Sequence, residues 1–337
     1  MEEVLSEVDT GNLRSSWIIG KGVDDIVARD TPSYKGWVYQ PQARVSDQKR
    51  REKMQRLIDD VCRSTPSTAA RNTEEDLMSD DVSPINPTSP ANMTEGEWKS
   101  RVECAAGHHL LELYHLTDMV EGVLGVRVED EPDAYLLKTY RTFFDEVCAS
   151  DLVKVRLDEE PDQGPGRPLN YSSVAQADGI FRRRPDINCI LHTHIPAATV
   201  VASLECGLLP VIQHALIVFN EIVYVDCDTG NDEDAVRDVL DQLRDKKIAM
   251  IRNHGVFVLG KSVAEVLFLT ITLEYACRCQ LDAMQTHAKV KTFDLDSAEQ
   301  LAAGFTGNPD NEFVFDGTLQ WEGWLRKLDR MGSCYRE

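Results

Sequence analysis

The stretch DINCILHTH at positions 186–194 constrains the fold of this chain more than any other segment. An apolar run follows Arg184 and Pro185 and ends in a histidine pair, after which IPAATVVASLEC has a helical pattern. This order predicts a buried strand that carries His192 and His194 at its C-terminal end. Because successive side chains of a strand point to opposite faces, the two imidazoles should face the same space.

A second stretch, IAMIRNHGVFVLG at 248–260, predicts a hairpin with Asn253, His254 and Gly255 at its turn. If the hairpin lies beside the first strand, His254 joins the pair. Three histidines with one open position are typical of a catalytic zinc site. The alternative is that the histidines only hydrogen-bond one another and nearby carbonyl groups at the strand ends. The spacing alone leaves both interpretations open.

Short strand patterns and helix patterns interleave along the chain, which favours an α/β fold with layers packed around a central sheet. Ser262 and Glu265 form a capping box, S-x-x-E, at the start of an apolar helix. Further strands are predicted at 122–128, 134–140, 152–157 and 221–227, and helices at 98–120, 173–184, 195–206, 232–247 and 262–284.

The chain divides into three parts by composition. Residues 1–97 contain a tail, a short amphipathic helix at 46–62 and a Ser/Pro-rich linker from 63 that we expect to be disordered. Residues 98–290 form the predicted folded domain. Residues 291–337 are a C-terminal extension whose last helix places Trp321 and Trp324 on one stripe and ends at Gly332. We expect that helix to dock on its own domain.

Charge narrows the possible partners. The chain has 57 acidic and 36 basic residues, a formal net charge of −21. Such a chain repels phosphate backbones and anionic lipid unless its basic residues cluster, and the nearest cluster, DQKRREK at 47–53, reads as a solvated helix face. We therefore expect no binding to nucleic acid.

The cysteines and the apolar runs indicate a cytoplasmic protein. Nine cysteines are scattered along the chain, and the only pair close in sequence is Cys277 and Cys279, inside a helical pattern. This usage predicts reduced thiols. The acidic N-terminus lacks the pattern of a signal peptide, and no apolar run reaches the length of a transmembrane helix.

The two histidine-bearing stretches closely resemble the class II aldolase and adducin superfamily. The resemblance is carried by RPDINCILHTHIPAATVVASLECGLLPV and AMIRNHGVFVLGKSVAEVLFLTITLEYACR, and it extends over 98–284 and the final helix. Within the superfamily it is nearest to the head domain of the adducins. It implies a three-layer α/β/α sandwich with a central, mainly antiparallel sheet, and assembly into a dimer or tetramer.

The resemblance also implies which residues are metal ligands and which catalytic groups of the enzymes have been replaced. In the enzymes of the family a divalent zinc is held by the residues that correspond to His192, His194 and His254. Their acid/base glutamate falls here on Ser173, whose hydroxyl cannot replace a tuned carboxylate at neutral pH. The phosphate-binding groups of the enzymes have also been replaced. They fall on Val123, Gly125, Tyr140 and Arg141.

Two functions follow from this pattern. The first is a non-enzymatic, adducin-like cytoskeletal protein that associates with actin filaments and spectrin and lies in the cytoplasm, at the periphery of the plasma membrane. Its aldolase site would be degenerate, with or without zinc. The alternative is a zinc-dependent aldolase or epimerase acting on a small sugar phosphate, in which Glu205, Glu221 or Asp226 replaces the missing acid. The remaining histidines carry less information: His108, His109 and His115 read as surface or boundary residues of a helix, and His214 lies near the position of a tyrosine proton donor.

Overall fold

The run that ends in the histidine pair forms β4 (Cys189–Thr193), the central strand of a seven-stranded sheet. All five residues of β4 are buried, as expected for a strand covered on both faces. The computed structural model describes residues 93–157, 159, 168–226, 233–305 and 315–337. The tail, the amphipathic helix predicted at 46–62 and most of the linker lie outside these residues.

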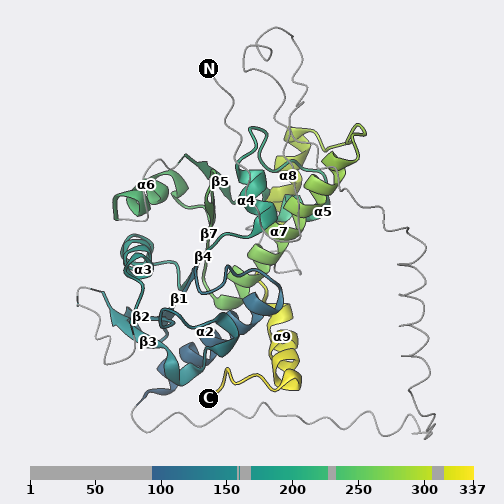
Figure 1. The fold of residues 1–337 in the computed structure, drawn as a ribbon. Helices are drawn as coiled ribbons and strands as arrows, with labels where there is room; N and C mark the ends of the chain where they lie inside the picture. The colour runs from purple at the N-terminus through teal and green to yellow at the C-terminus, as the bar shows by residue number, and fades with distance from the viewer. Residues whose placement is uncertain (1–92, 158, 160–167, 227–232, 306–314) are drawn as a thin grey trace, which may run out of the picture. The chain divides into compact units, whose positions relative to one another are not determined.

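The sheet is mainly antiparallel, as expected (Figure 1). Its order is β3-β2-β1-β4-β7-β6-β5, and β5 and β6 form a parallel pair while the other neighbours run antiparallel. The other strands are β1 (Val123–Val128), β2 (Glu131–Leu137), β3 (Val153–Arg156), β5 (Ile222–Val225), β6 (Ile248–Ile251) and β7 (Gly255–Gly260).

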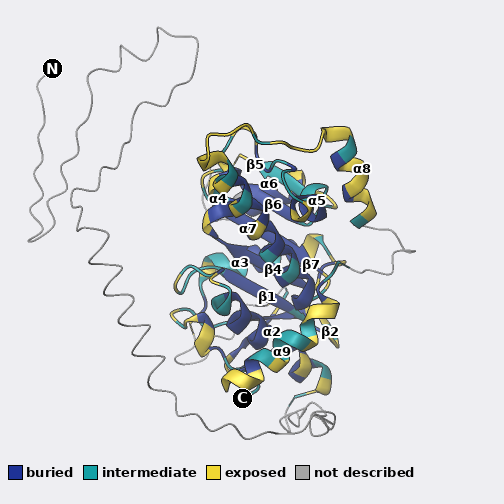
Figure 2. Ribbon diagram, turned by 90° about the vertical axis from the view of Figure 1, so that its right-hand side faces the viewer, coloured by how far each residue is buried: buried dark blue, intermediate teal, exposed yellow. Residues whose placement is uncertain are grey.

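Helices cover both faces of the sheet and form a hydrophobic core on each. Neighbouring residues of a strand enter different cores. On β1, Leu124 enters the first core and Val123 the second, and on β4, Leu191 enters the first and Ile190 the second. The first core includes α2 (Glu95–Leu113), α4 (Pro196–Ala202), α5 (Gln213–Phe219), α7 (Val263–Gln285) and α9 (Thr318–Met331), and the second includes α3 (Tyr171–Arg183) and α6 (Glu233–Leu243). Figure 2 shows the buried sheet between these layers. The predicted three-layer α/β/α architecture is confirmed.

Helix α2 corrects two predictions. It ends at Leu113 instead of continuing to 120, and His115 just beyond it has a left-handed backbone with φ 56°. His108 and His109 were expected near the surface, yet they are only 0% and 7% exposed. The helix is enclosed because β1, the short 3-10 helices η3 (Phe144–Glu146) and η4 (Ala149–Asp151), and α9 all contact it.

The C-terminal helix α9 packs on α2 and α7. Trp324 Nε1 donates a hydrogen bond of 3.1 Å to the Tyr114 hydroxyl, and Leu328 is 1% exposed. Gly332 ends the helix in the left-handed conformation, with φ 69°, which glycine adopts without a steric penalty. One further helix, α8 (Leu295–Phe305), packs against α5.

None of the helices in the described part of the chain combines the length and the apolar character needed to span a membrane.

Candidate metal centre

Three imidazoles meet at the end of β4. His192 lies on the strand, His194 follows its last residue, and His254 lies in the turn between β6 and β7. The ring centroids are 4.9 Å apart for His192 and His194, 5.2 Å for His192 and His254, and 5.1 Å for His194 and His254. One nitrogen from each ring lies within 4.8 Å of the others. The structure thus brings together the three residues that the sequence singled out, and we call them the histidine cluster.

His192 is the most deeply placed member of the cluster. It is 4% exposed, its ring stacks on Phe257 at a centroid distance of 4.4 Å, and its Nδ1–H donates to the Val256 carbonyl at 3.1 Å. Burial, together with the neighbouring His194 and His254, lowers the pKa of His192 to about 3. The ring therefore stays neutral at physiological pH, with Nε2 available as a lone-pair donor.

His194 is oriented by a carboxylate. Its Nδ1–H donates to Asp118 Oδ2 at 3.0 Å, which leaves Nε2 as the available lone-pair nitrogen. A carboxylate behind a histidine ligand fixes the ring orientation and increases its basicity, and such pairs are common at zinc sites. The two residues are 76 positions apart in the sequence.

The turn that carries His254 is fixed by its surroundings. Asn253 adopts a left-handed backbone with φ 59°, and its N–H donates to Ser203 Oγ at 3.0 Å. The Arg252 guanidinium donates to the carbonyl groups of Ala202 and Leu204, at the C-terminal end of α4. A side chain at Gly255 would place Cβ 2.7 Å from His194 Cδ2, so glycine is required there for His194 to keep its position. Burial is the main cause of the lowered pKa of His254, and His194 adds to it.

The donor set fits a divalent metal ion such as zinc. The hydrogen bonds from Nδ1 of His192 and His194 point their Nε2 atoms away from those partners, and the neutral state that a ligand needs is already favoured at His192 and His254. His194 and His254 are only partly buried, so a fourth position can open to solvent. Three imidazoles with one open position are the pattern of a zinc site that can bind a further ligand.

A shallow depression adjoins the histidine cluster along β1. Val123 pairs with His192 across the sheet, and a Cβ on Gly122 would lie 2.9 Å from the His192 carbonyl oxygen. The cavity volume of the depression is only about 10 Å³, far below the roughly 300–1,000 Å³ of typical small-molecule pockets. Nine residues line it: Val120, Gly122, Val123, Leu124, Leu137, Lys138, Tyr140, Asn170 and Ser173. None of these nine carries a carboxylate.

The polar groups of the depression are largely engaged with the protein itself. Lys138 Nζ donates to the carbonyl groups of Val120 and Thr142, at 2.8 and 3.0 Å. Asn170 Oδ1 accepts from the N–H of Ser172 at the start of α3. Burial lowers the pKa of Lys138 to about 8. A substrate would therefore have to displace existing hydrogen bonds, which costs free energy.

The structure separates the predicted substrate-site positions into two groups. Ser173, Val123 and Tyr140 line the depression, whereas Gly125 and Arg141 do not. Gly125 lies inside β1, where a Cβ would come within 3.0 Å of the Ile190 side chain, so it serves sheet packing. Arg141 is exposed in a turn with φ 73°. Three of the five predicted positions thus line the depression, and the role of all five in a degenerate substrate site stays a prediction.

Glu205, Glu221 and Asp226, the three candidates for the missing acid, line neither the depression nor the histidine cluster. Asp226 forms an ion pair with Arg252 at 3.2 Å, and Glu205 is exposed after α4. The main-chain carbonyl of Glu221 accepts from Ile248 at the start of β6. His214 lies on α5, where its ring contacts Tyr275 of α7 at a centroid distance of 4.8 Å, so it does not join the histidine cluster.

Two groups at the site were not foreseen. Asp118 supports His194, and Lys138 supplies the cation of the depression. Lys138 follows β2 directly, and Asp118 lies in the loop before β1. Neither position has a local motif, so only the pairing of β1 with β4 could have pointed to them.

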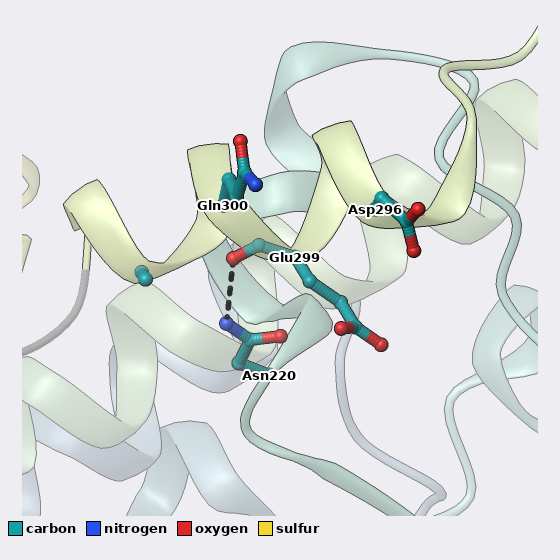
Figure 3. A pocket seen from close by; sticks show the side chains of 5 residues that line it. Asn220, Asp296, Glu299 and Gln300 are labelled. Carbon is teal, nitrogen blue, oxygen red and sulfur yellow. Dashed lines mark hydrogen bonds between the residues drawn. The ribbon is translucent and has the colours of Figure 1, made fainter.

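A second, open hollow lies along α8 (Figure 3). It is lined by Asn220, Asp296, Glu299, Gln300 and Ala303, and the Asn220 amide donates to the Glu299 carbonyl at 3.2 Å. Its lining holds no histidine or cysteine, and its acidic groups are those of a solvated helix face. The histidine cluster therefore remains the better candidate for function.

Comparisons with known proteins agree with this geometry. Residues 102–281 match the family described as the class II aldolase and adducin N-terminal domain. Human beta-adducin is 30% identical over 267 residues, which cover 74% of this chain and 36% of the relative. The chain thus spans little more than a third of the length of the adducins it matches. A putative aldolase class 2 protein of Caulobacter vibrioides is 31% identical over 247 residues, which cover 73% of this chain and 95% of that protein.

Solved structures show the same architecture. An aldolase II superfamily protein from Pseudomonas syringae has a TM-score of 0.66 and 28% identity, covering 73% of this chain and 98% of its own. The L-fuculose 1-phosphate aldolase of Glaciozyma antarctica PI12 has a TM-score of 0.61 and 20% identity, covering 74% and 96%. At 20% identity the latter likeness concerns the fold alone.

Proposed function

Because this chain belongs to the class II aldolase and adducin family, we propose that it is a non-enzymatic, adducin-like scaffold protein that keeps a metal-binding pocket without turnover. The proposal separates two parts of the ancestral site. The histidine cluster would still bind a divalent ion, and the depression beside it would no longer process a substrate.

One observation carries the proposal: no carboxylate lines the depression next to the histidine cluster. Aldol chemistry needs a group that removes and returns a proton, and a positioned acid or base contributes about 10² to 10⁴ in rate. Ser173 occupies the position that the family resemblance assigns to this group. The one described carboxylate hydrogen-bonded to the cluster, Asp118, is engaged with His194 Nδ1.

A bound zinc ion would supply Lewis-acid polarisation of a carbonyl oxygen. His192, His194 and His254 would hold it, and Asp118 would orient His194. The Lys138 ammonium would attract an anion to the mouth of the depression, but its two carbonyl partners restrain it. Without a proton-transferring neighbour, these groups support ligand binding more readily than cleavage.

The scaffold role includes assembly and partners. The similarity to beta-adducin supports self-association of this domain and association with actin filaments and spectrin near the plasma membrane. Because the chain matches only 36% of that relative, the proposal concerns only the functions of the matched part of an adducin. The net charge of −21 opposes direct contact with an acidic filament, so a partner chain or a local basic surface would have to mediate it.

The second candidate is a zinc-dependent aldolase or epimerase. It is favoured by the complete histidine cluster and by the Caulobacter relative, a putative aldolase matched over 95% of its length. In that case Asp118, or a group from a second copy of this chain, would have to provide the missing acid.

The two candidates are separated by measuring metal binding and turnover on the same full-length protein. We expect zinc to bind with an affinity that falls more than about 100-fold in His254→Ala, because direct ligands contribute more than their supporting partners. We expect no zinc-dependent cleavage of L-fuculose 1-phosphate. Cleavage above background in the zinc-loaded protein that disappears in His254→Ala would replace the scaffold role with the enzymatic one. His287→Asn, an exposed histidine outside the cluster, is the matched control.

The assembly part is tested by sedimentation. The chain should run as a dimer or tetramer and pellet with actin filaments at physiological salt, alone or with spectrin. A monomer that remains in the supernatant in both cases would remove the cytoskeletal part of the proposal while leaving the metal result unaffected.

A further inference from the structure

Two cysteines that are far apart in the sequence meet beside the C-terminal helix. Cys148 lies between η3 and η4, and Cys334 follows α9. Their sulfur atoms are 3.0 Å apart although 186 positions separate the residues. A disulfide has an S–S distance of about 2.05 Å, so a shift of about 1 Å would bring the atoms to bonding distance. Both thiols are partly exposed, so a small oxidant can reach them.

The two segments are held together by a hydrogen-bond arrangement centred on His109 of α2. Its Nε2–H donates at 3.0 Å to the carbonyl of Val147, the residue before Cys148. Its Nδ1 accepts at 2.8 Å from the hydroxyl of Ser333, the residue before Cys334. One buried imidazole thus contacts the residue before each cysteine, through the Val147 carbonyl and the Ser333 hydroxyl. The neutral tautomer with the proton on Nε2 satisfies both bonds.

Two further contacts seat the C-terminal segment on the same loop. The Ser150 N–H donates to the Glu337 carbonyl at 2.9 Å, and Tyr335 is fully buried with its hydroxyl donating to Asp329 at 2.8 Å. The thiols are therefore neighbours because the fold positions them, and they keep this arrangement without a covalent bond. Such preorganisation raises the effective concentration of one thiol at the other.

We propose that Cys148 and Cys334 form a reversible redox site, whose disulfide locks the segment after α9 to the loop between β2 and β3. The oxidant is a low-molecular-weight disulfide such as oxidised glutathione. This function is independent of the histidine cluster, which contains neither residue.

The exchange proceeds in two balanced steps. The Cys334 sulfur, deprotonated, attacks one sulfur of the glutathione disulfide, and the first glutathione leaves and takes up a proton. Cys148 then loses its proton and attacks the Cys334 sulfur, and the second glutathione leaves as a thiol. Two cysteine thiols are oxidised and one glutathione disulfide is reduced to two thiols.

The hydrogen bond between the sulfurs supports this order. Cys148 is the donor and Cys334 the acceptor. Burial and the contact with Cys334 raise the pKa of Cys148 to about 12, so Cys148 is mainly protonated at neutral pH. Closure requires the Cys148 thiol to lose its proton, so it should be faster in mildly alkaline buffer than at neutral pH.

The experiment is thiol mapping of the reduced full-length chain after equilibration in glutathione buffers of increasing oxidised fraction. We expect a species that has lost about 2 Da, two hydrogens, and a non-reducing peptide map that links Cys148 to Cys334. Cys206→Ser, which removes an exposed cysteine away from the pair, should behave like the wild type. Cys148→Ser and Cys334→Ser should instead accumulate a glutathione adduct on the remaining partner.

A second measurement does not depend on the variants. The oxidised wild type should unfold at a midpoint about 5–15 °C above the reduced form, because the bond closes a long loop of the unfolded chain. Oxidised wild type that carries only glutathione adducts, or that links other cysteines as readily as this pair, would overturn the proposal.

Discussion

The histidine cluster and the depression beside it lie next to each other along β4 and β1 but differ in the side chains that they offer. The cluster keeps three imidazoles, a supporting carboxylate and a glycine that makes room for His194. The depression has a lining without any carboxylate, and its lysine and asparagine are bonded to nearby main-chain groups. One half of the pocket is therefore equipped to hold a cation, and the lining of the other half contains no carboxylate that could transfer a proton.

The fold constrains the histidine cluster more tightly than it constrains the depression. His192 lies on the central strand, stacked on Phe257 and bonded to the backbone of β7, so its replacement disturbs the core. Ser173 lies at the start of α3, only partly buried, where most side chains can be accommodated. A substitution at His192 should therefore destabilise the fold more than a substitution at Ser173.

Lowering the pH should have the largest effect on stability, because the histidine cluster contains a buried neutral imidazole. Burial lowers the pKa of both His192 and His108 to about 3, from an unfolded value near 6.5. The unfolded chain therefore gains protons first as pH falls below 6.5, and the folded state loses about 1.4 kcal/mol per pH unit for each histidine, or about 4 kcal/mol for both by pH 5. At neutral pH and above this contribution is fully present.

Urea unfolding of the metal-free protein between pH 7 and pH 5 measures this slope. His192→Asn should reduce the slope by about one proton, and His287→Asn should leave it unchanged. An unaltered slope in His192→Asn would mean that the cluster is not held neutral by burial.

Removing the supporting carboxylate should have an intermediate effect. Asp118→Asn leaves the three imidazoles in place but weakens the partner of His194 Nδ1. Zinc affinity should fall about 10- to 100-fold, about 1.4–2.7 kcal/mol, measured by competition with a chromophoric chelator. Glu121→Gln is the matched control. That carboxylate accepts a hydrogen bond from the Tyr140 hydroxyl and, among the described residues, is not hydrogen-bonded to any of the three histidines. Equal losses in the two variants would refute a specific role for Asp118.

Restoring an acid in the depression should have the smallest effect. Ser173→Glu places a carboxylate in the first turn of α3, where the helix dipole favours it, so the free energy of unfolding should rise by less than about 1 kcal/mol relative to Ser173→Gln. Zinc-dependent cleavage of L-fuculose 1-phosphate should stay at background, because the family resemblance predicts that the phosphate-binding groups are also replaced. Turnover in Ser173→Glu but not in Ser173→Gln would show that only one group separates the depression from an active site.

The sequence was most informative where one local pattern decides the structure. The apolar run before His192, the turn at Asn253 and the capping box at Ser262 each depend on neighbouring residues, and β4, the hairpin and α7 follow from them. The family resemblance supplied what periodicity could not, the mainly antiparallel sheet and the three layers, whereas the order of the strands came only from the structure. The tail and the helix predicted at 46–62 lie outside the described residues.

The sequence was least informative where distant segments meet. His108 and His109 looked like boundary residues because the pattern of α2 does not reveal that η3 and α9 cover its other sides. Asp118 and Lys138 have no motif, since their roles arise only when β1 pairs with β4. The predicted end of α2 failed because apolar residues continue past Leu113, while the backbone turns at His115.

The central position of β4 also determines what chelation should do. Its residues are paired with β1 on one side and β7 on the other, and cores lie on both faces. The polypeptide, and not an ion, therefore holds the imidazoles in register. Unlike a zinc finger, which unfolds when stripped of its metal, this architecture should keep its fold when a chelator is added.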